Sequence, residues 1–260
     1  MLVVRIIGIL AGIFICQLLA AMFASSVILP FELEGMADQV LAMNFVWLIL
    51  FYSLFAILLL LREEEDLFFP DRTSLILVIL LVPVGILFQI AGTELENLSS
   101  LLFERNYKQL ELVESIVSVP GTPGLVFAML VVGVTPAVFE EIFFRYGIQS
   151  FIRKKYPFWV SVSVTSLVFA LIHFNPTGLA SIFLISLLLG WIYEKTGKLV
   201  YPVVLHFSVN MTVVVVYRLD IDVQGFRPEE GGAHIDPLLL SVSVIMLGGL
   251  LYLIRKTKLS

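Results

Sequence analysis

The sequence predicts an all-α protein that crosses a membrane several times. Hydrophobic residues make up 59% of the 260 residues, charged residues only 14%, and the mean hydropathy is +1.01. An ordinary soluble domain carries about 25% charged residues. Long windows without Asp, Glu, Lys or Arg also recur along the chain. We therefore expect a polytopic transmembrane helical bundle.

The uncharged windows set the expected number of helices. There are seven: 6–31, 39–61, 73–93, 115–139, 156–193, 199–217 and 237–254. A helix needs roughly 20 apolar residues to cross about 30 Å of hydrocarbon. The window 156–193 is nearly twice that length and holds a turn signal, Asn175-Pro176-Thr177-Gly178, in its middle. Dividing it there gives about eight transmembrane helices.

Basic residues predict the orientation of these helices. An arrangement with both termini in the cytoplasm (N-in/C-in) places twelve of the sixteen Lys and Arg residues inside and leaves only Arg105, Lys108, Arg218 and Arg227 outside. The alternative for residues 1–25 is a cleaved signal peptide, although their apolar run is longer than the usual 7 to 15 residues. We expect the cell (inner) membrane of a prokaryote.

We expect one integral membrane domain over residues 1–260. Its parts are N-terminal helices in 1–119 (three spans plus an interfacial segment), catalytic core helices in 120–217 and a C-terminal helix in 237–255. Residues 94–118 have apolar residues at helical spacing, which is typical of an amphipathic element at the outer interface. Residues 218–236 are polar and Gly-rich and predict a mobile outer loop, with His234 as an ordinary surface residue.

Composition also excludes several classes of function. Cys16 is the only cysteine, so there is no internal disulfide, CxxC redox pair or thiolate metal site. The net charge of -5 is spread over loops, and no basic tract interleaved with aromatic residues indicates nucleic acid as a partner.

Three charged residues stand inside an otherwise apolar segment: Glu140, Glu141 and Arg145. A charge at bilayer depth costs about 2.5 to 3.5 kcal/mol on insertion scales, so three together indicate pairing and chemistry. Glu141 and Arg145 are four residues apart, which predicts an ion pair within one helix. Glu140 points roughly 100° away and has no basic residue at helical spacing. Glu140 is therefore the better candidate for a general base.

Two of the three histidines, His173 and His206, fall within predicted spans. Asn210 follows His206 by four residues, so the imidazole and the carboxamide share one helix face and form a suitable pair of donors for an anionic intermediate. If the fourth helix ends near Ile148, Glu140 and His206 lie roughly 12 to 15 Å from the cytoplasmic edge and His173 about 24 Å. The three then meet only if the fifth helix is displaced, tilts, or starts before Tyr156.

These residues belong to three motifs that resemble the CAAX prenyl endopeptidase and bacteriocin-processing family of intramembrane proteases, also called the Abi or Rce1-like family. The motifs are Glu140-Glu141-x-x-Phe144-Arg145, then Phe169-Ala170-Leu171-Ile172-His173, and then Gly190-Trp191-Ile192-Tyr193-Glu194-Lys195-Thr196-Gly197-Lys198-Leu199 leading to His206-x-x-x-Asn210. The resemblance covers about residues 120–215. Before residue 120 the interpretation rests on hydropathy.

The resemblance implies a peptide hydrolase of membrane-associated peptides or proteins, lipidated ones included. Water would be activated by Glu140 with help from His173. His206 and Asn210 would form the oxyanion hole, and Glu141 and Arg145 would support the site. No cofactor is favoured. The alternative is a metalloprotease in which Glu140, His173 and His206 bind Zn²⁺ and Glu141 is the base.

Two other classes of function also use buried polar residues. A transporter or proton relay would use the Glu and His residues in a process that depends on a gradient. A catalytically inactive scaffold, which acts by binding partners, would tolerate Glu140→Gln. The protease reading places the active site within reach of the cytoplasmic side, with the lipid bilayer and a peptide or lipidated protein as partners. No residue in the sequence indicates that the protein recognises a prenyl group.

Overall fold

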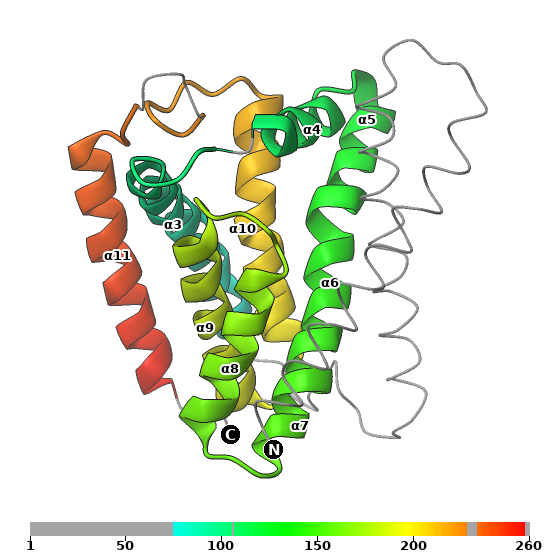
Figure 1. Cartoon of the computed structure of the whole chain (residues 1–260), viewed down its shortest axis with the longest axis vertical. Coiled ribbons are helices and arrows are strands. Elements are labelled where there is room, and N and C mark those ends of the chain that lie inside the picture. Colours follow the sequence, from blue (N-terminus) through cyan, green and yellow to red (C-terminus); the bar gives the residue numbers. More distant parts are fainter. Residues whose placement is uncertain (1–74, 106, 228–232, 258–260) are drawn as a thin grey trace.

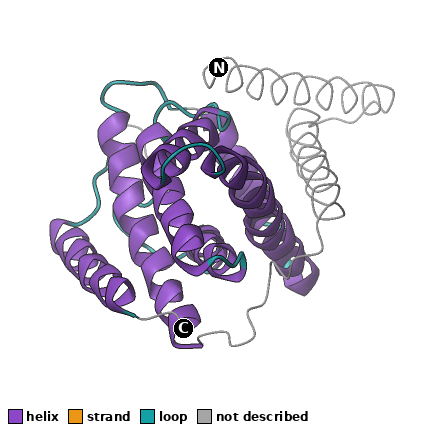
Figure 2. Cartoon of the chain, turned by 90° about the horizontal axis from the view of Figure 1, so that it is seen from below, coloured by secondary structure: helices purple, strands orange, loops and turns teal. Residues whose placement is uncertain are grey.

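The computed structural model describes residues 75–105, 107–227 and 233–257. This part contains helices and loops and no strand (Figure 2). The elements are α3 (Leu75–Ser99), α4 (Tyr107–Val117), α5 (Gly121–Ala128), η1 (Met129–Val134), α6 (Thr135–Glu141), η2 (Ile142–Gln149), α7 (Ser150–Arg153), α8 (Phe158–Leu171), α9 (Leu179–Thr196), α10 (Val200–Arg218) and α11 (Pro237–Lys256). The two segments η1 and η2 are π-helical.

The helices are those of a multi-pass membrane protein. Within the described residues, five are long and apolar enough to cross a membrane: 75–99, 121–153, 179–196, 200–218 and 237–256. The helix α8 was expected to be a further span, but its 14 residues rise only about 21 Å. The first two predicted spans lie outside the described residues. The total of eight spans and the N-in/C-in orientation therefore stay predictions.

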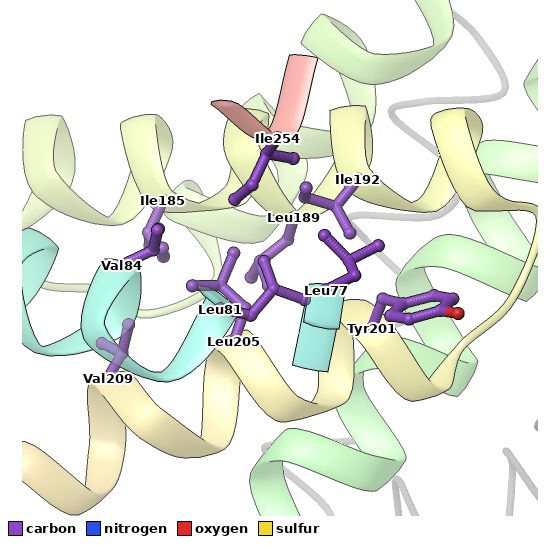
Figure 3. Packing of buried hydrophobic residues seen from close by; sticks show 10 residues of the cluster. All are labelled: Leu77, Leu81, Val84, Ile185, Leu189, Ile192, Tyr201, Leu205, Val209 and Ile254. Atoms are coloured by element: carbon purple, nitrogen blue, oxygen red, sulfur yellow. The ribbon is translucent and has the colours of Figure 1, made fainter. Parts of the chain in front are cut away.

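The main hydrophobic core lies between α3, α9, α10 and α11 (Figure 3). Its buried residues are Leu77, Leu81, Val84, Ile185, Leu189, Ile192, Tyr201, Leu205, Val209 and Ile254. The backbones of α3 and α10 come close at Gly85, where a Cβ would lie 2.6 Å from the Ser208 Cβ. Only a glycine fits this position without a shift of α10, so α10 is held in a fixed place against α3.

A second core cluster positions the long helix over 121–153 against α8. Phe144 is fully buried and meets Phe143 and Phe169 edge to face, with ring centroids 4.9 and 4.8 Å away. Such aromatic pairs contribute about 0.5 to 1.5 kcal/mol beyond their buried area. Phe169, one turn before His173, is therefore fixed next to the helix that carries the two glutamates.

The α8–α9 turn ends short of the level that α5 and α10 reach (Figure 1). Its polar groups are satisfied locally, because Asn175 Oδ1 accepts from the Thr177 hydroxyl at 2.8 Å and from the Gly178 N–H at 3.0 Å. This is the turn that the sequence predicted at Asn175–Gly178. A chain reversal at membrane depth needs such partners, because hydrocarbon offers no water to its polar groups.

The expected mismatch in depth between His173 and Glu140 disappears because the long helix extends further than predicted. That helix continues to Arg153 and does not end near Ile148. Glu140 is then about 20 Å from the turn at residues 154–157, at 1.5 Å per residue, and His173 about 22 Å from the same turn. The expectation that His173 lies much deeper than Glu140 was wrong because it took the helix end too early.

Glu94 ties the outer loop after α10 to the end of α3. It accepts from His234 Nδ1 at 2.7 Å and from the Ile235 N–H at 2.8 Å, and Ile235 is buried. Asn97 donates to the Gly225 carbonyl at 2.9 Å. Within the described parts of this loop, 219–227 and 233–236, Phe226 and Ile235 are thus buried against the bundle, and the expected mobility of the loop stays a prediction. His234 is half-exposed but is an ion-pair partner and not an ordinary surface residue.

The predicted amphipathic segment 94–118 is divided between two helices. Its first residues extend α3 to Ser99, and its second half forms α4. The apolar side of α4 packs on α5 and α10, with Ile116 and Val117 buried against Ala128 and Val214. The predicted amphipathic helix is therefore present over α4, and its place at a membrane interface stays a prediction.

Candidate active site

The site lies on the long helix Gly121–Arg153, which contains the two π-helical segments η1 and η2. Glu140 and Glu141 end the α-helical segment α6, and Arg145 lies in the π-helical segment η2. The π-helical segment η2 is followed by Ser150, whose backbone N–H donates to the Arg145 carbonyl five residues earlier. The Ser150 hydroxyl donates to the same carbonyl at 3.0 Å. Isolated π-helical turns are costly and occur frequently at functional sites.

The predicted ion pair between Glu141 and Arg145 is present. Arg145 Nε donates to Glu141 Oε2 at 2.8 Å, and both side chains are fully buried. A buried ion pair offsets the cost of its own desolvation only where further hydrogen bonds satisfy the remaining atoms. Such bonds are present here, since Arg145 Nη2 donates to the Ser186 hydroxyl at 2.9 Å and Nη1 to Gln149 Oε1 at 3.4 Å.

His206 connects the two glutamates. Its Nδ1 lies 2.9 Å from Glu141 Oε1, and its Nε2 lies 4.0 Å from Glu140 Oε2. A carboxylate only accepts hydrogen bonds, so Nδ1 carries the proton that goes to Glu141. The Nε2 side of the ring then faces Glu140, which is part-exposed while Glu141 is fully buried. The two neighbouring carboxylates therefore have different environments. Glu141 is bonded to Arg145 and His206, whereas Glu140 is partly exposed.

His173 is one aromatic ring away from this cluster. Its Nδ1 lies 2.7 Å from the Phe169 carbonyl, which only accepts, so Nδ1 carries the proton and Nε2 of the neutral ring is an acceptor. The Phe169 ring is 4.7 Å from the His173 ring and 6.0 Å from the His206 ring, centroid to centroid. The structure thus brings Glu140, Glu141, Arg145 and His206 into one network, and the Phe169 ring contacts the rings of both His173 and His206.

Asn210 lies one turn beyond His206 on α10. Its Nδ2 donates to the Val132 carbonyl at 3.0 Å, and Val132 belongs to η1. A carboxamide nitrogen carries two hydrogens, so one N–H of Asn210 is used in this bond and one remains. At the same level Gly133 allows close packing, because a Cβ there would lie 2.8 Å from Met211 Sδ. The amide of Asn210 is therefore held in a fixed orientation on the long helix.

The residues of the zinc alternative are not grouped as a metal site in the part of the chain that the structure describes. Over the described ranges, no three His, Cys, Asp or Glu side chains are grouped so as to hold a metal ion. His206 Nδ1 is also bonded to Glu141, the residue that this alternative needs as a base. We derive no step through a metal.

Residues 122–212 match the family model described as type II CAAX prenyl endopeptidase Rce1-like. This stretch of the chain is therefore similar to the Rce1-like family. The resemblance to this family, which the motifs predicted over about residues 120–215, is thereby confirmed. No curated protein and no solved structure matches the chain. The matched stretch covers the long helix, α8, α9 and the first two-thirds of α10, so it contains every residue of the network described above.

Sequence reasoning missed two members of this polar network. Gln149 and Ser186 are both fully buried and both contact Arg145. Gln149 had a detectable signal, since it follows Arg145 by four residues as Arg145 follows Glu141. Ser186 had none, because a single serine in an apolar helix commonly bonds to its own backbone.

Proposed function

We propose that this protein is an intramembrane endopeptidase of the CAAX type, in which Glu140 activates a water molecule and His206 and Asn210 stabilise the oxyanion. The observation that supports this most directly is the position of Glu140 Oε2 at 4.0 Å from His206 Nε2, on the open side of a buried Glu141–Arg145 pair. A base and an anion-stabilising group then face the same space, as peptide hydrolysis requires.

The reaction proceeds by addition and elimination. Glu140 takes a proton from water as the water oxygen bonds to the scissile carbonyl carbon. The carbonyl oxygen becomes an oxyanion, which accepts hydrogen bonds from His206 Nε2–H and from the free N–H of Asn210. Glu140 then returns the proton to the leaving nitrogen as the C–N bond breaks, giving a carboxylic acid and an amine.

This role fixes the charge of the His206 ring. Its Nδ1–H donates to Glu141, so a ring that also donates from Nε2 must carry both protons. An imidazolium has a carboxylate next to each nitrogen here, at 2.9 and 4.0 Å. Glu141 thus acts through His206: it orients the ring and balances its charge, as the buried aspartate does for the histidine of a serine protease.

His173 has a separate role in this proposal. Its Nδ1–H is bound to the Phe169 carbonyl, which leaves Nε2 as an acceptor that can orient the same water molecule. The Phe169 ring packs against both imidazoles, with ring centroids 4.7 Å from His173 and 6.0 Å from His206. His173 therefore assists the base, whereas His206 serves the oxyanion.

The substrate is a membrane-associated peptide or protein, lipidated ones included, that reaches the site from the cytoplasmic side. The basic residues support this direction. The ends of α7, α9 and α11 and the turns next to them carry Arg153, Lys154, Lys155, Lys195, Lys198, Arg255 and Lys256. Lys and Arg collect on the cytoplasmic side of membrane proteins.

Cleavage by detergent-purified protein tests the proposal. The substrate is a quenched fluorescent C-terminal peptide, offered with and without a lipidated cysteine, and the wild type is compared with Glu140→Ala with and without a strong chelator. We expect cleavage by the wild type in either condition and its loss in Glu140→Ala. Equal cleavage by both proteins would overturn the role of Glu140, and loss of wild-type cleavage in chelator would favour the metal alternative.

A further inference from the structure

Arg145 donates to three side chains at once, and only one of them is Glu141. Its Nη2 donates to the Ser186 hydroxyl on α9 at 2.9 Å, and its Nη1 to Gln149 Oε1 at 3.4 Å. Arg145, Glu141, Ser186 and Gln149 are all fully buried. A guanidinium is a planar fork of five N–H donors, so partners at separate nitrogens fix the plane of the group as well as its position.

Gln149 in turn is fixed by α9. Its Nε2 donates to the Gly190 carbonyl at 3.1 Å and to Glu194 Oε1 at 3.2 Å. A larger residue at position 190 would collide with this network, because a Cβ there would lie 2.8 Å from Gln149 Oε1 and 3.3 Å from Arg145 Nη1. The glycine of the third sequence motif thus makes room for the amide that supports Arg145.

Glu141, Arg145 and Gln149 are spaced four residues apart along the long helix. In an α-helix, residues four apart are offset by about 40° around the axis, so a file of three such residues drifts by about 80°. A π-helix has more than four residues in each turn, so residues four apart are offset in the opposite sense. Arg145 and Gln149 both lie in η2 and Glu141 immediately precedes it. Arg145 bonds to both Glu141 and Gln149. The three side chains form one row that faces α9 and α10, where they meet Ser186, the Gly190 carbonyl and His206.

We propose that Ser186 and Gln149 are positioning residues of the hydrolytic site, which hold the Arg145 guanidinium so that Glu141 keeps His206 turned toward Glu140. This inference rests on the proposed function. Glu141 has two oxygens with different partners: Oε2 is bound to Arg145 and Oε1 to His206. If the guanidinium turns, Glu141 turns with it, and the His206 ring loses the bond that sets its orientation.

Ser186→Ala tests the inference with Ser166→Ala as a matched control. Both serines are fully buried, but Ser166 on α8 has no hydrogen-bond partner in the part of the chain that the structure describes. Small misplacements of a catalytic group cost up to about 100-fold in rate. We expect Ser186→Ala to lower kcat roughly 10-fold or more with KM unchanged, and Ser166→Ala to leave both unchanged. The same loss in both variants, or no loss in Ser186→Ala, would overturn the inference.

A double-mutant cycle with Glu141→Gln separates positioning from general destabilisation. If Ser186 acts through Arg145 and Glu141, its substitution has little left to disturb once the Glu141 carboxylate is gone. We expect Ser186→Ala to lower kcat in the wild type and to have no further effect in the Glu141→Gln variant, measured with enough enzyme to follow slow cleavage. Equal fold-losses in the two backgrounds would contradict a role through Glu141.

A readout that needs no activity keeps this inference separable from the proposed function. The chain has three histidines, so ¹⁵N-histidine labelling gives few imidazole signals, and a His206→Asn variant assigns those of His206. We expect Ser186→Ala to shift the His206 Nδ1 signals and Ser166→Ala to leave them in place. Unchanged His206 signals in Ser186→Ala would overturn the positioning role. Identical cleavage by wild type and Glu140→Ala would overturn the proposed function and leave this measurement valid.

Discussion

The bundle contains two Glu–His pairs of the same kind, one in the candidate active site and one at the outer loop. In both, a histidine Nδ1 is bonded to a glutamate, at 2.9 Å for His206 and Glu141 and at 2.7 Å for His234 and Glu94. They differ at the other ring nitrogen. His206 Nε2 faces the part-exposed carboxylate of Glu140, whereas no second carboxylate is paired with His234 among the described residues.

The cations near the two pairs also differ. Glu141 is bound to a buried arginine, while Glu94 is satisfied by a backbone N–H and by the side chain of Asn97. Asn97 in turn accepts from Arg105 at 2.6 Å. The outer pair thus holds a loop to a helix end. A Glu–His pair is therefore not by itself a sign of catalysis, and the part-exposed carboxylate of Glu140 is what distinguishes the pair at the candidate active site.

The largest effect is expected from exchanging the carboxylate in each region. Glu140→Gln removes the base but keeps the size of the side chain, and loss of a general base costs roughly 10²- to 10⁴-fold in rate. Glu94→Gln, with the same change of atoms, is expected to leave kcat of the folded protein unchanged. Cleavage assays on both variants make the test, and an equal loss of kcat in both would show that the two pairs do not differ in role.

The two asparagines sharpen the comparison at a smaller scale. Asn210→Ala removes the expected oxyanion donor, which typically costs about 10²- to 10³-fold in kcat. Asn97→Ala breaks the bonds to Glu94 and to the Gly225 carbonyl, so we expect a lower unfolding temperature without a change in kcat. Thermal unfolding and cleavage should be measured on both variants. A large loss of kcat in Asn97→Ala would mean that the outer network reaches the active site.

The smallest effect is expected for His234. Its side chain is half-exposed, and exposed ion pairs contribute about 0 to 1 kcal/mol. His234→Asn should therefore lower the unfolding temperature slightly and leave kcat as it is, whereas His206→Asn should abolish cleavage. If the unfolding temperature of His234→Asn fell as far as that of a core variant, the outer loop would be a main part of the folding unit.

Sequence alone predicted what is local along the helix. The Glu141–Arg145 pair followed from a spacing of four residues, and the Asn175–Gly178 turn followed from its residue types. Residue spacing did not predict the contacts between segments that are distant in the sequence. His206 is 65 residues from Glu141, and spacing does not report the packing of α10 on the long helix. Only the motifs shared with the Rce1-like family placed His206 with the glutamates before the structure was known.

Other features depend on small geometric differences that propensity does not record. The extension of the long helix to Arg153 moved Glu140 to the level of His173. The π-helical winding of η2 and the bonds of Gln149 to α9 also have no strong sequence signal, since the same residues fit an α-helix equally well. Likewise, polar residues and glycines in the outer loop predicted mobility, but Ile235 and Phe226 of that loop are buried.

The separation of Glu141 and His206 along the chain has a consequence for biosynthesis. Glu141 and Arg145 enter the membrane in the same turn of one helix, so the growing chain inserts an almost neutral pair and avoids part of the cost of about 2.5 to 3.5 kcal/mol for each lone charge. His206 and Asn210 follow only with α10. A nascent chain therefore holds Glu141 in an ion pair but lacks His206 and Asn210, the proposed oxyanion donors, until α10 has left the ribosome and packed against the long helix.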